Sequence, residues 1–307
     1  MNLTYQNWIL LFFLSFVWGS SFILMKLGMF TSTGAAIFSD TQVAALRMLL
    51  ASLTLLPFAI RKFHLLKSLR NLRLLSIVGL AGNFLPAFLF TYAETELPSG
   101  YAGMLNSFTP IFALIIGWGI FKSKLTNYQL IGVFIGTTGI VLLTLSGSAP
   151  KGGASWLHIG AIVLATLCYA ISLNTIKYTL NHIKSIEITS LSFAITLPIS
   201  IAITFVTDIP QTLLETPNAF QGFSFIAILS VIGTALAVVL FTKLISNSSI
   251  LFASSVTYLI PLVALLIGLA FDEPINIYQI TSMILVLCGI FMANVLTNRK
   301  SSQRIKK

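Results

Sequence analysis

FVWGSSFILMK, residues 16–26, is the stretch on which the fold of this 307-residue chain depends, because the second half of the chain repeats its pattern. It lies in an apolar run and places a Trp, a Gly and two Ser ahead of Lys26. A second apolar run, 151 residues further on, carries Tyr169, Ser172 and Lys177 with the same spacing between aromatic residue and lysine. This echo predicts an internal repeat.

The composition excludes an ordinary soluble domain. The chain is 56% apolar and 8% charged, with a mean hydropathy of +0.95, whereas soluble domains carry about 25% charged residues. Long continuous apolar runs favour membrane helices over barrel strands, which are shorter and alternate in polarity. We therefore expect an all-α membrane protein with ten transmembrane helices. The expected spans are 8–27, 41–60, 72–92, 99–121, 128–145, 156–177, 186–206, 222–243, 249–270 and 276–296.

The net charge of +10 has an uneven distribution that predicts the orientation. If the N-terminus is cytoplasmic, most Lys and Arg residues fall on cytoplasmic connections, and the outer connections hold only Lys151. The positive-inside rule then places both termini in the cytoplasm. We expect a multi-pass protein of a bacterial inner membrane, whose basic charge faces anionic lipid and not nucleic acid.

The two halves can be superposed in sequence. At an offset of 151, later 150, identical residues coincide over eight and then four positions, with Pro110 and Pro261 the most informative pair. We place the first repeat at 1–147 and the second at 148–307. Each repeat has an odd number of spans, so the second must enter the membrane from the opposite side. Inverted repeats build alternating-access transporters with a midplane site; a duplicated membrane protein that transports nothing is the alternative.

Polar side chains inside the spans are the candidates for such a site, since they are costly in lipid unless they face protein or water. The same residues could instead tie helix to helix. Pro110 and Pro261 break the backbone hydrogen-bond pattern at equivalent places, either as hinges or as fixed kinks. The candidate substrate-binding residues are Trp18, Ser21, Arg47, Asn83, Asn106, Tyr169, Asn174 and Tyr258.

Of these residues, Arg47 has the highest free-energy cost of insertion into the membrane, because its side chain is charged. It lies seven residues beyond Asp40, or about 10 Å into the membrane at the helical rise. It either ties its helix to neighbours and snorkels, or it contacts an acidic group of a substrate. Glu94 and Glu96 are the nearest acids, and we expect them in a solvated loop. Because no Asp, Glu or His lies well inside any span, the pattern favours a neutral, zwitterionic or amphipathic organic solute, with no metal and no cofactor.

The motifs, taken in order, resemble the EamA-like transporters of the drug/metabolite transporter superfamily. The resemblance covers about residues 8–297 and implies two inverted five-helix repeats that export small metabolites such as amino acids. Phe271-Asp-Glu-Pro274 departs from the Gly-Glu often found after helix 9 of that family. The matching motifs are Trp18-Gly-Ser-Ser-Phe22 with Lys26, Ala45-Leu46-Arg47, Leu105-Asn106-Ser107-Phe108-Thr109-Pro110 and Tyr258 to Pro261.

These observations lead to one hypothesis and its competitors. We expect a secondary transporter that exports a small organic metabolite by alternating access; a homodimer is compatible with the sequence. An exchanger of phosphorylated or nucleotide-linked metabolites would need more basic residues at the cavity. An intramembrane enzyme would need a nucleophile, base or metal set at membrane depth, and the spans contain no His or carboxylate well inside. A channel or receptor is the remaining class, and a channel would stay open to both sides.

Overall fold

The computed structural model describes residues 5–31, 33–123, 126–145, 156–254, 256–271 and 277–292. These residues form helices and connecting turns, with one isolated bridge between Phe30 and Ala36. Eight helical stretches, three of them containing a short 3-10 or π segment, are long and apolar enough to cross a membrane. The expected all-helical membrane fold is therefore confirmed for the described residues.

The helices follow the expected spans closely, and three spans are divided by a local change of helix type. In chain order they are α1 (Tyr5–Met29), α2 (Asp40–Ile60), the 3-10 helix η1 (Phe63–Lys67), α3 (Leu69–Gly79), the π-helix η2 (Leu80–Phe84), α4 (Leu85–Glu94), α5 (Ser99–Leu105), the 3-10 helix η3 (Asn106–Phe108), α6 (Thr109–Gly119), α7 (Asn127–Leu145), α8 (Trp156–Thr179), α9 (Ser185–Val206), α10 (Ile209–Glu215), α11 (Ala219–Ile228), the π-helix η4 (Leu229–Leu236), α12 (Ala237–Asn247), α13 (Ile250–Ser254), α14 (Val256–Ala270) and α15 (Ile277–Phe291).

The structure adds one short helix to the expected arrangement and does not settle the expected number of ten spans. The short helix α10 lies in 207–221, the connection between the expected spans 186–206 and 222–243. Helices α7 and α15 occupy the fifth and tenth expected spans but are not among the eight candidates, so the count of ten remains a prediction. The proposed repeat boundary falls within 146–155, outside the described residues.

Helices α2 and α9, which the repeat makes equivalent, pack together antiparallel. At the start of α2, Gln42 Nε2 donates to the carbonyl of Thr207 just after α9, at 2.7 Å. At the other end, Lys62 Nζ lies 2.8 Å from Glu187 Oε1 in the first turn of α9. The N-terminal end of each helix therefore meets the C-terminal end of the other, although the two have corresponding sequence positions.

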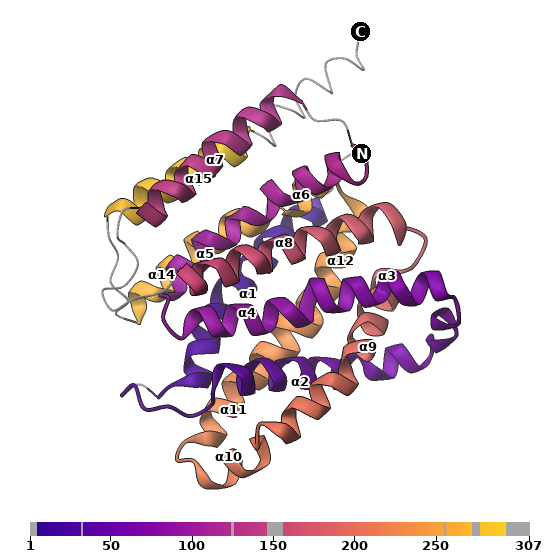
Figure 1. Ribbon diagram of the computed structural model, residues 1–307, viewed down its shortest axis with the longest axis vertical. Coiled ribbons are helices and arrows are strands. Elements are labelled where there is room, and N and C mark those ends of the chain that lie inside the picture. The colour runs from indigo at the N-terminus through magenta and orange to yellow at the C-terminus, as the bar shows by residue number, and fades with distance from the viewer. Residues whose placement is uncertain are drawn as a thin grey trace.

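Helices α7 and α15 form the second pair of equivalent helices in contact, and they lie at the edge of the molecule (Figure 1). Gly289, near the end of α15, packs on the first half of α7: a Cβ at this glycine would lie 2.5 Å from Gly132 O and 2.5 Å from Gly136 N. This pair is antiparallel as well. The missing side chain lets the two backbones approach, as small residues commonly do in membrane helix pairs.

The contacts of the remaining helices come in equivalent pairs: replacing each helix by its repeat partner turns one contact into another that is also present. Helix α1 packs along α14, and its equivalent α8 packs along α6. Helix α8 also packs along α4, as α1 does along α12. In Figure 1, α1 and α8 lie in the middle of the bundle, with the α2–α9 pair on one side and the α7–α15 pair on the other. The core of the bundle thus lies between the halves.

Candidate functional site

A cavity lies between the two halves, and six of the eight candidate residues line it. Trp18 and Ser21 come from α1, Arg47 from α2, and Asn83 from η2. Asn106 at the start of η3 and Tyr169 of α8 complete the six. Residues that the sequence places up to 151 positions apart thus share one space. The apolar lining includes Phe90, Phe241, Val238, Leu173 and Ile176.

The lining consists largely of residue pairs that the repeat relates. Such pairing places the cavity on the pseudo-two-fold axis that relates the two halves, because a site on that axis is lined by equivalent residues from both halves. The pairs at an offset of 151 are Trp18/Tyr169, Ser21/Ser172, Phe22/Leu173, Met25/Ile176, Asn83/Thr234, Phe90/Phe241, Asn106/Thr257 and Thr109/Ile260.

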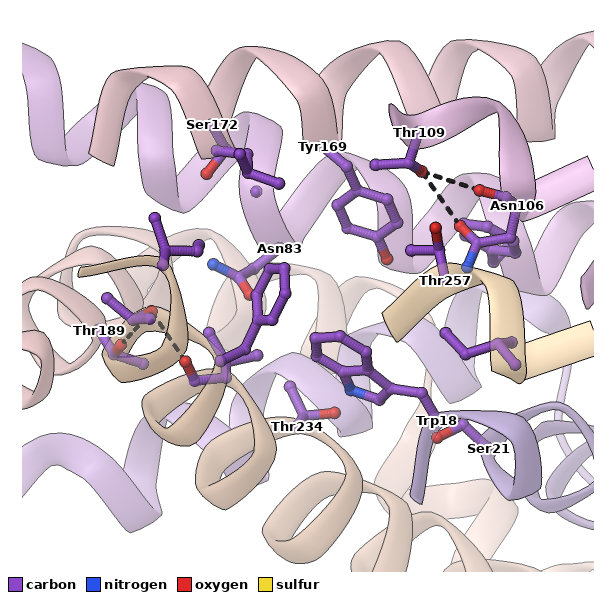
Figure 2. A pocket seen from close by; sticks show the side chains of 18 of the residues that line it. Trp18, Ser21, Asn83, Asn106, Thr109, Tyr169, Ser172, Thr189, Thr234 and Thr257 are labelled. Atoms are coloured by element: carbon purple, nitrogen blue, oxygen red, sulfur yellow. Dashed lines mark hydrogen bonds between the residues drawn. The ribbon is translucent and has the colours of Figure 1, made fainter. Parts of the chain in front are cut away.

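Contacts between aromatic rings obey the same relation. The Trp18 and Phe241 rings meet edge to face with centroids 4.8 Å apart, and the equivalent Tyr169 and Phe90 rings stack at 6.0 Å. Figure 2 shows Trp18 and Tyr169 pointing from α1 and α8 into the same space. The indole Nε1 of Trp18 donates to the carbonyl of Gly233 in η4 at 2.9 Å. Each of these two aromatic contacts therefore joins one ring from the first half to one ring from the second.

The two π-helices, η2 and η4, occupy equivalent positions and carry equivalent hydrogen bonds. Asn83 Nδ2 donates to Val78 O at 3.3 Å, and Thr234 Oγ1 donates to Leu229 O at 3.0 Å. Both bonds reach back five residues, to carbonyls at the π-helical widening. Such widenings are rare and occur often at functional sites. Here they turn the side chains of Asn83 and Thr234 toward the cavity (Figure 2).

Glycine and serine pack together in the same symmetric way beside the π-helices. A Cβ at Gly82 would collide with the side chain of Ser172, and a Cβ at Gly233 would lie 3.2 Å from Ser21 Oγ. Both positions therefore favour glycine, because a serine of the other half occupies the space that a Cβ would fill. Ser21 itself donates to Val17 O at 2.9 Å, so its hydroxyl has a partner within α1.

Arg47 crosses from the first half to the second. Its Nε donates to Thr234 Oγ1 at 2.8 Å, and its Nη1 lies 3.6 Å from the sulfur of Met25. The side chain is half-buried and faces the cavity. Arg47 therefore ties α2 to η4 and at the same time presents a cation to the cavity.

The two prolines differ in local structure although their sequence positions match. Pro110 stands at the start of α6, directly after the 3-10 segment η3, whereas Pro261 lies inside α14. A proline leaves the carbonyl four residues earlier without its helical donor. Thr109 Oγ1 donates to Asn106 O at 2.9 Å and Ser107 Oγ donates to Thr257 O at 3.3 Å. Hydroxyl groups thus satisfy both carbonyls, and whether either proline acts as a hinge remains a prediction.

Of the two remaining candidate residues, the structure describes the side chain of Asn174 alone. Asn174 is fully buried away from the cavity, and its Nδ2 donates to Ala113 O of α6 at 3.0 Å and Ala170 O at 2.9 Å. Of the two roles that the sequence analysis left open, Asn174 therefore has the structural one: it links α8 to α6. The side chain of Tyr258 lies outside the described part of the structure.

The expectation of a solvated Glu94 was wrong. Glu96 is exposed as expected, but Glu94 is only 1% exposed. The reason is that α4 extends to Glu94 and the chain turns back at Pro98, so that the buried start of α5 folds over the end of α4. This turn is a tertiary feature that the local pattern did not indicate.

Several lining residues were missed by the sequence analysis, although its own repeat register identifies three of them. Thr234 and Thr257 are the repeat partners of Asn83 and Asn106, and Ser172 is the partner of Ser21. A threonine inside a helix usually bonds its own backbone and carries no signal by itself. Transferring each candidate to its repeat partner would have found all three.

Comparison with known proteins identifies what the chain is similar to. Residues 6–145 and 156–295 each match the EamA-like transporter family. The chain is 28% identical over 261 residues to the "Uncharacterized inner membrane transporter YedA" of Escherichia coli (strain K12), covering 84% of this chain and 80% of that protein. It is 23% identical to the "Uncharacterized transporter YyaM" of Bacillus subtilis (strain 168), covering 94% and 93%. A solved structure titled "Crystal structure of protein" shares the fold with a TM-score of 0.65 at 14% identity, over 96% of this chain and 98% of that one.

Proposed function

Since this chain belongs to the EamA-like transporter family, we propose that it is a secondary transporter of the inner membrane that exports a small organic metabolite by alternating access. The observation that carries the proposal is the cavity lined by repeat-related pairs such as Trp18/Tyr169 and Asn83/Thr234. A binding site on the pseudo-two-fold axis between two inverted repeats can be reached from both sides of the membrane. If the two halves exchange conformations, a site that was open to one side becomes open to the other.

Inversion of the repeats is supported by the two pairs of equivalent helices that touch. Helices α2 and α9 run antiparallel, as their end contacts Gln42–Thr207 and Lys62–Glu187 require. Repeats with the same orientation in the membrane would make equivalent helices parallel. The inner membrane is supported by the name of the E. coli relative, and cytoplasmic termini are supported by the charge distribution.

The lining suits a solute with both an apolar body and polar groups. Trp18 and Tyr169 offer ring surfaces, whereas Asn83, Asn106 and Thr257 offer amide and hydroxyl groups. Binding sites for small molecules commonly combine an apolar wall with a few placed polar groups. An exchanger for phosphorylated metabolites is less well supported, because Arg47 is the one basic residue among the described lining.

Reconstitution into proteoliposomes tests the proposal. Vesicles loaded with a panel of radiolabelled metabolites should release at least one of them faster than vesicles without protein. An excess of the unlabelled solute outside should drive counterflow, which a carrier supports and an open channel does not.

Asn106→Leu should abolish this flux, because the Asn106 amide would be lost from the cavity. The control Gly160→Ala, on α8 with nothing near its Cβ position, should leave the flux unchanged. Flux without counterflow would contradict alternating access, and no flux across the panel would contradict transport.

A further inference from the structure

We propose that the transported solute is an organic monoanion, with one carboxylate bound by the guanidinium of Arg47 and an apolar body held among aromatic rings. The inference rests on the proposed transport function and specifies its substrate class. It begins from the charge of the cavity: Arg47 is the one formally charged side chain among the described lining residues.

The guanidinium retains donors that no protein group uses. It has five N–H groups in a fixed planar fork. One donates to Thr234, and the other described contact is with the weakly accepting sulfur of Met25 at 3.6 Å. Within the described part of the chain, no carboxylate oxygen lies within 4.0 Å of Arg47. The Thr234 bond fixes the side chain at Nε, so the outer nitrogens are positioned for a carboxylate, whose two oxygens match the fork.

The repeat shows that this charge is not required to build the bundle. Helix α9, the counterpart of α2 in the second half, contains no Lys or Arg, and it packs against α2 without a cation of its own. A cation at membrane depth without an ion-pair partner is costly even when it is only half-buried. One half therefore carries a charge that the architecture of the other half does without, which is expected of a ligand-binding group.

Charge balance narrows the class of solute. One guanidinium compensates one negative charge, so a phosphate ester with two charges would bring an uncompensated charge into the cavity. The ammonium of an amino acid would find no carboxylate among the described lining residues. Glu94, the buried carboxylate at the end of α4, is not among the lining residues. The apolar body would contact Trp18, Tyr169, Phe90 and Phe241, which contribute two pairs of touching rings.

Four probes of similar size test the inference on the full-length protein in proteoliposomes. They are 3-phenylpropionate (monoanion), 3-phenylpropanamide (its neutral counterpart), phenylalanine (zwitterion) and phenyl phosphate (dianion at neutral pH). We expect 3-phenylpropionate to inhibit metabolite flux and to undergo counterflow at concentrations at least tenfold lower than any of the other three. Equal or stronger action of the amide, of phenylalanine or of phenyl phosphate would overturn the inference, while flux of any panel metabolite would leave the transport proposal standing.

Variants of Arg47 add a second, independent measurement. Arg47→Gln should weaken inhibition by 3-phenylpropionate roughly 30-fold or more, the usual consequence of removing one partner of a buried charge pair, and should leave the weak effect of the amide unchanged. Arg47→Lys keeps the charge and should retain part of the preference. An equal loss for acid and amide would assign Arg47 a structural role and refute the inference. If Arg47→Gln does not fold, the order of the four probes on the unaltered protein still decides.

Discussion

Replacing Gly79 by Ala should force α3 away from α9. A Cβ at Gly79 would lie 2.5 Å from the carbonyl oxygen of Ser192 and 3.2 Å from Cγ2 of Thr196. Ordinary contacts of a Cβ begin at 3.4 Å, so the approach to the carbonyl is short by 0.9 Å. A backbone carbonyl cannot rotate aside as a side chain can. The helices must therefore separate, and the neighbouring Val78, which lines the cavity, should move with α3.

The magnitude is best obtained as a difference from a matched variant. Alanine is a better helix former than glycine by about 1 kcal/mol, a gain that Gly79→Ala and Gly160→Ala share. Gly160 has nothing within 4 Å of its Cβ position, so only Gly79→Ala suffers overpacking, which costs about 1–3 kcal/mol. We expect Gly79→Ala to be less stable than Gly160→Ala by this amount.

Unfolding of the purified variants in detergent, followed by circular dichroism through a denaturant titration, measures the difference. A lower midpoint for Gly79→Ala, together with slower metabolite flux in proteoliposomes, would support the close approach of α3 and α9. Equal midpoints for the two variants would refute the reasoning, because the overlap with the Ser192 carbonyl would then have no energetic consequence.

Two further substitutions test how polar backbone groups are satisfied inside the bundle. Ser107→Ala should lower the free energy of unfolding by about 1–3 kcal/mol, because the Thr257 carbonyl would lose its hydroxyl donor at 3.3 Å; the same titration on Ser224→Ala, an exposed serine bonded within its own helix, should show almost no change, and equal losses would contradict the argument. Lys177→Met should cost about 2 kcal/mol, since Lys177 Nζ donates to two carbonyls at the end of α12 and just beyond it, at 2.9 and 2.6 Å. The exposed Lys243 provides the control Lys243→Met, and equal stability of the two lysine variants would show that these bonds contribute nothing.

Much of the fold follows from sequence because the lipid bilayer imposes simple rules on a chain. A span must be long, apolar and helical, so the expected ranges 41–60 and 186–206 fall within a residue of α2 and α9. The register of the repeat also needed no structure, since Pro110/Pro261 and Trp18/Tyr169 can be aligned by eye. That register relates both walls of the cavity before any contact is known.

The tertiary structure decided which polar residues face the cavity. Asn106 and Asn174 look alike in sequence, each an amide inside an apolar span, yet one lines the cavity and the other bonds a carbonyl of α6. The position of a residue along an apolar span sets its depth in the membrane, but the direction of its side chain depends on where neighbouring helices pack. Likewise, the bond between Arg47 and Thr234 joins residues 187 positions apart, and only the folded chain brings them together.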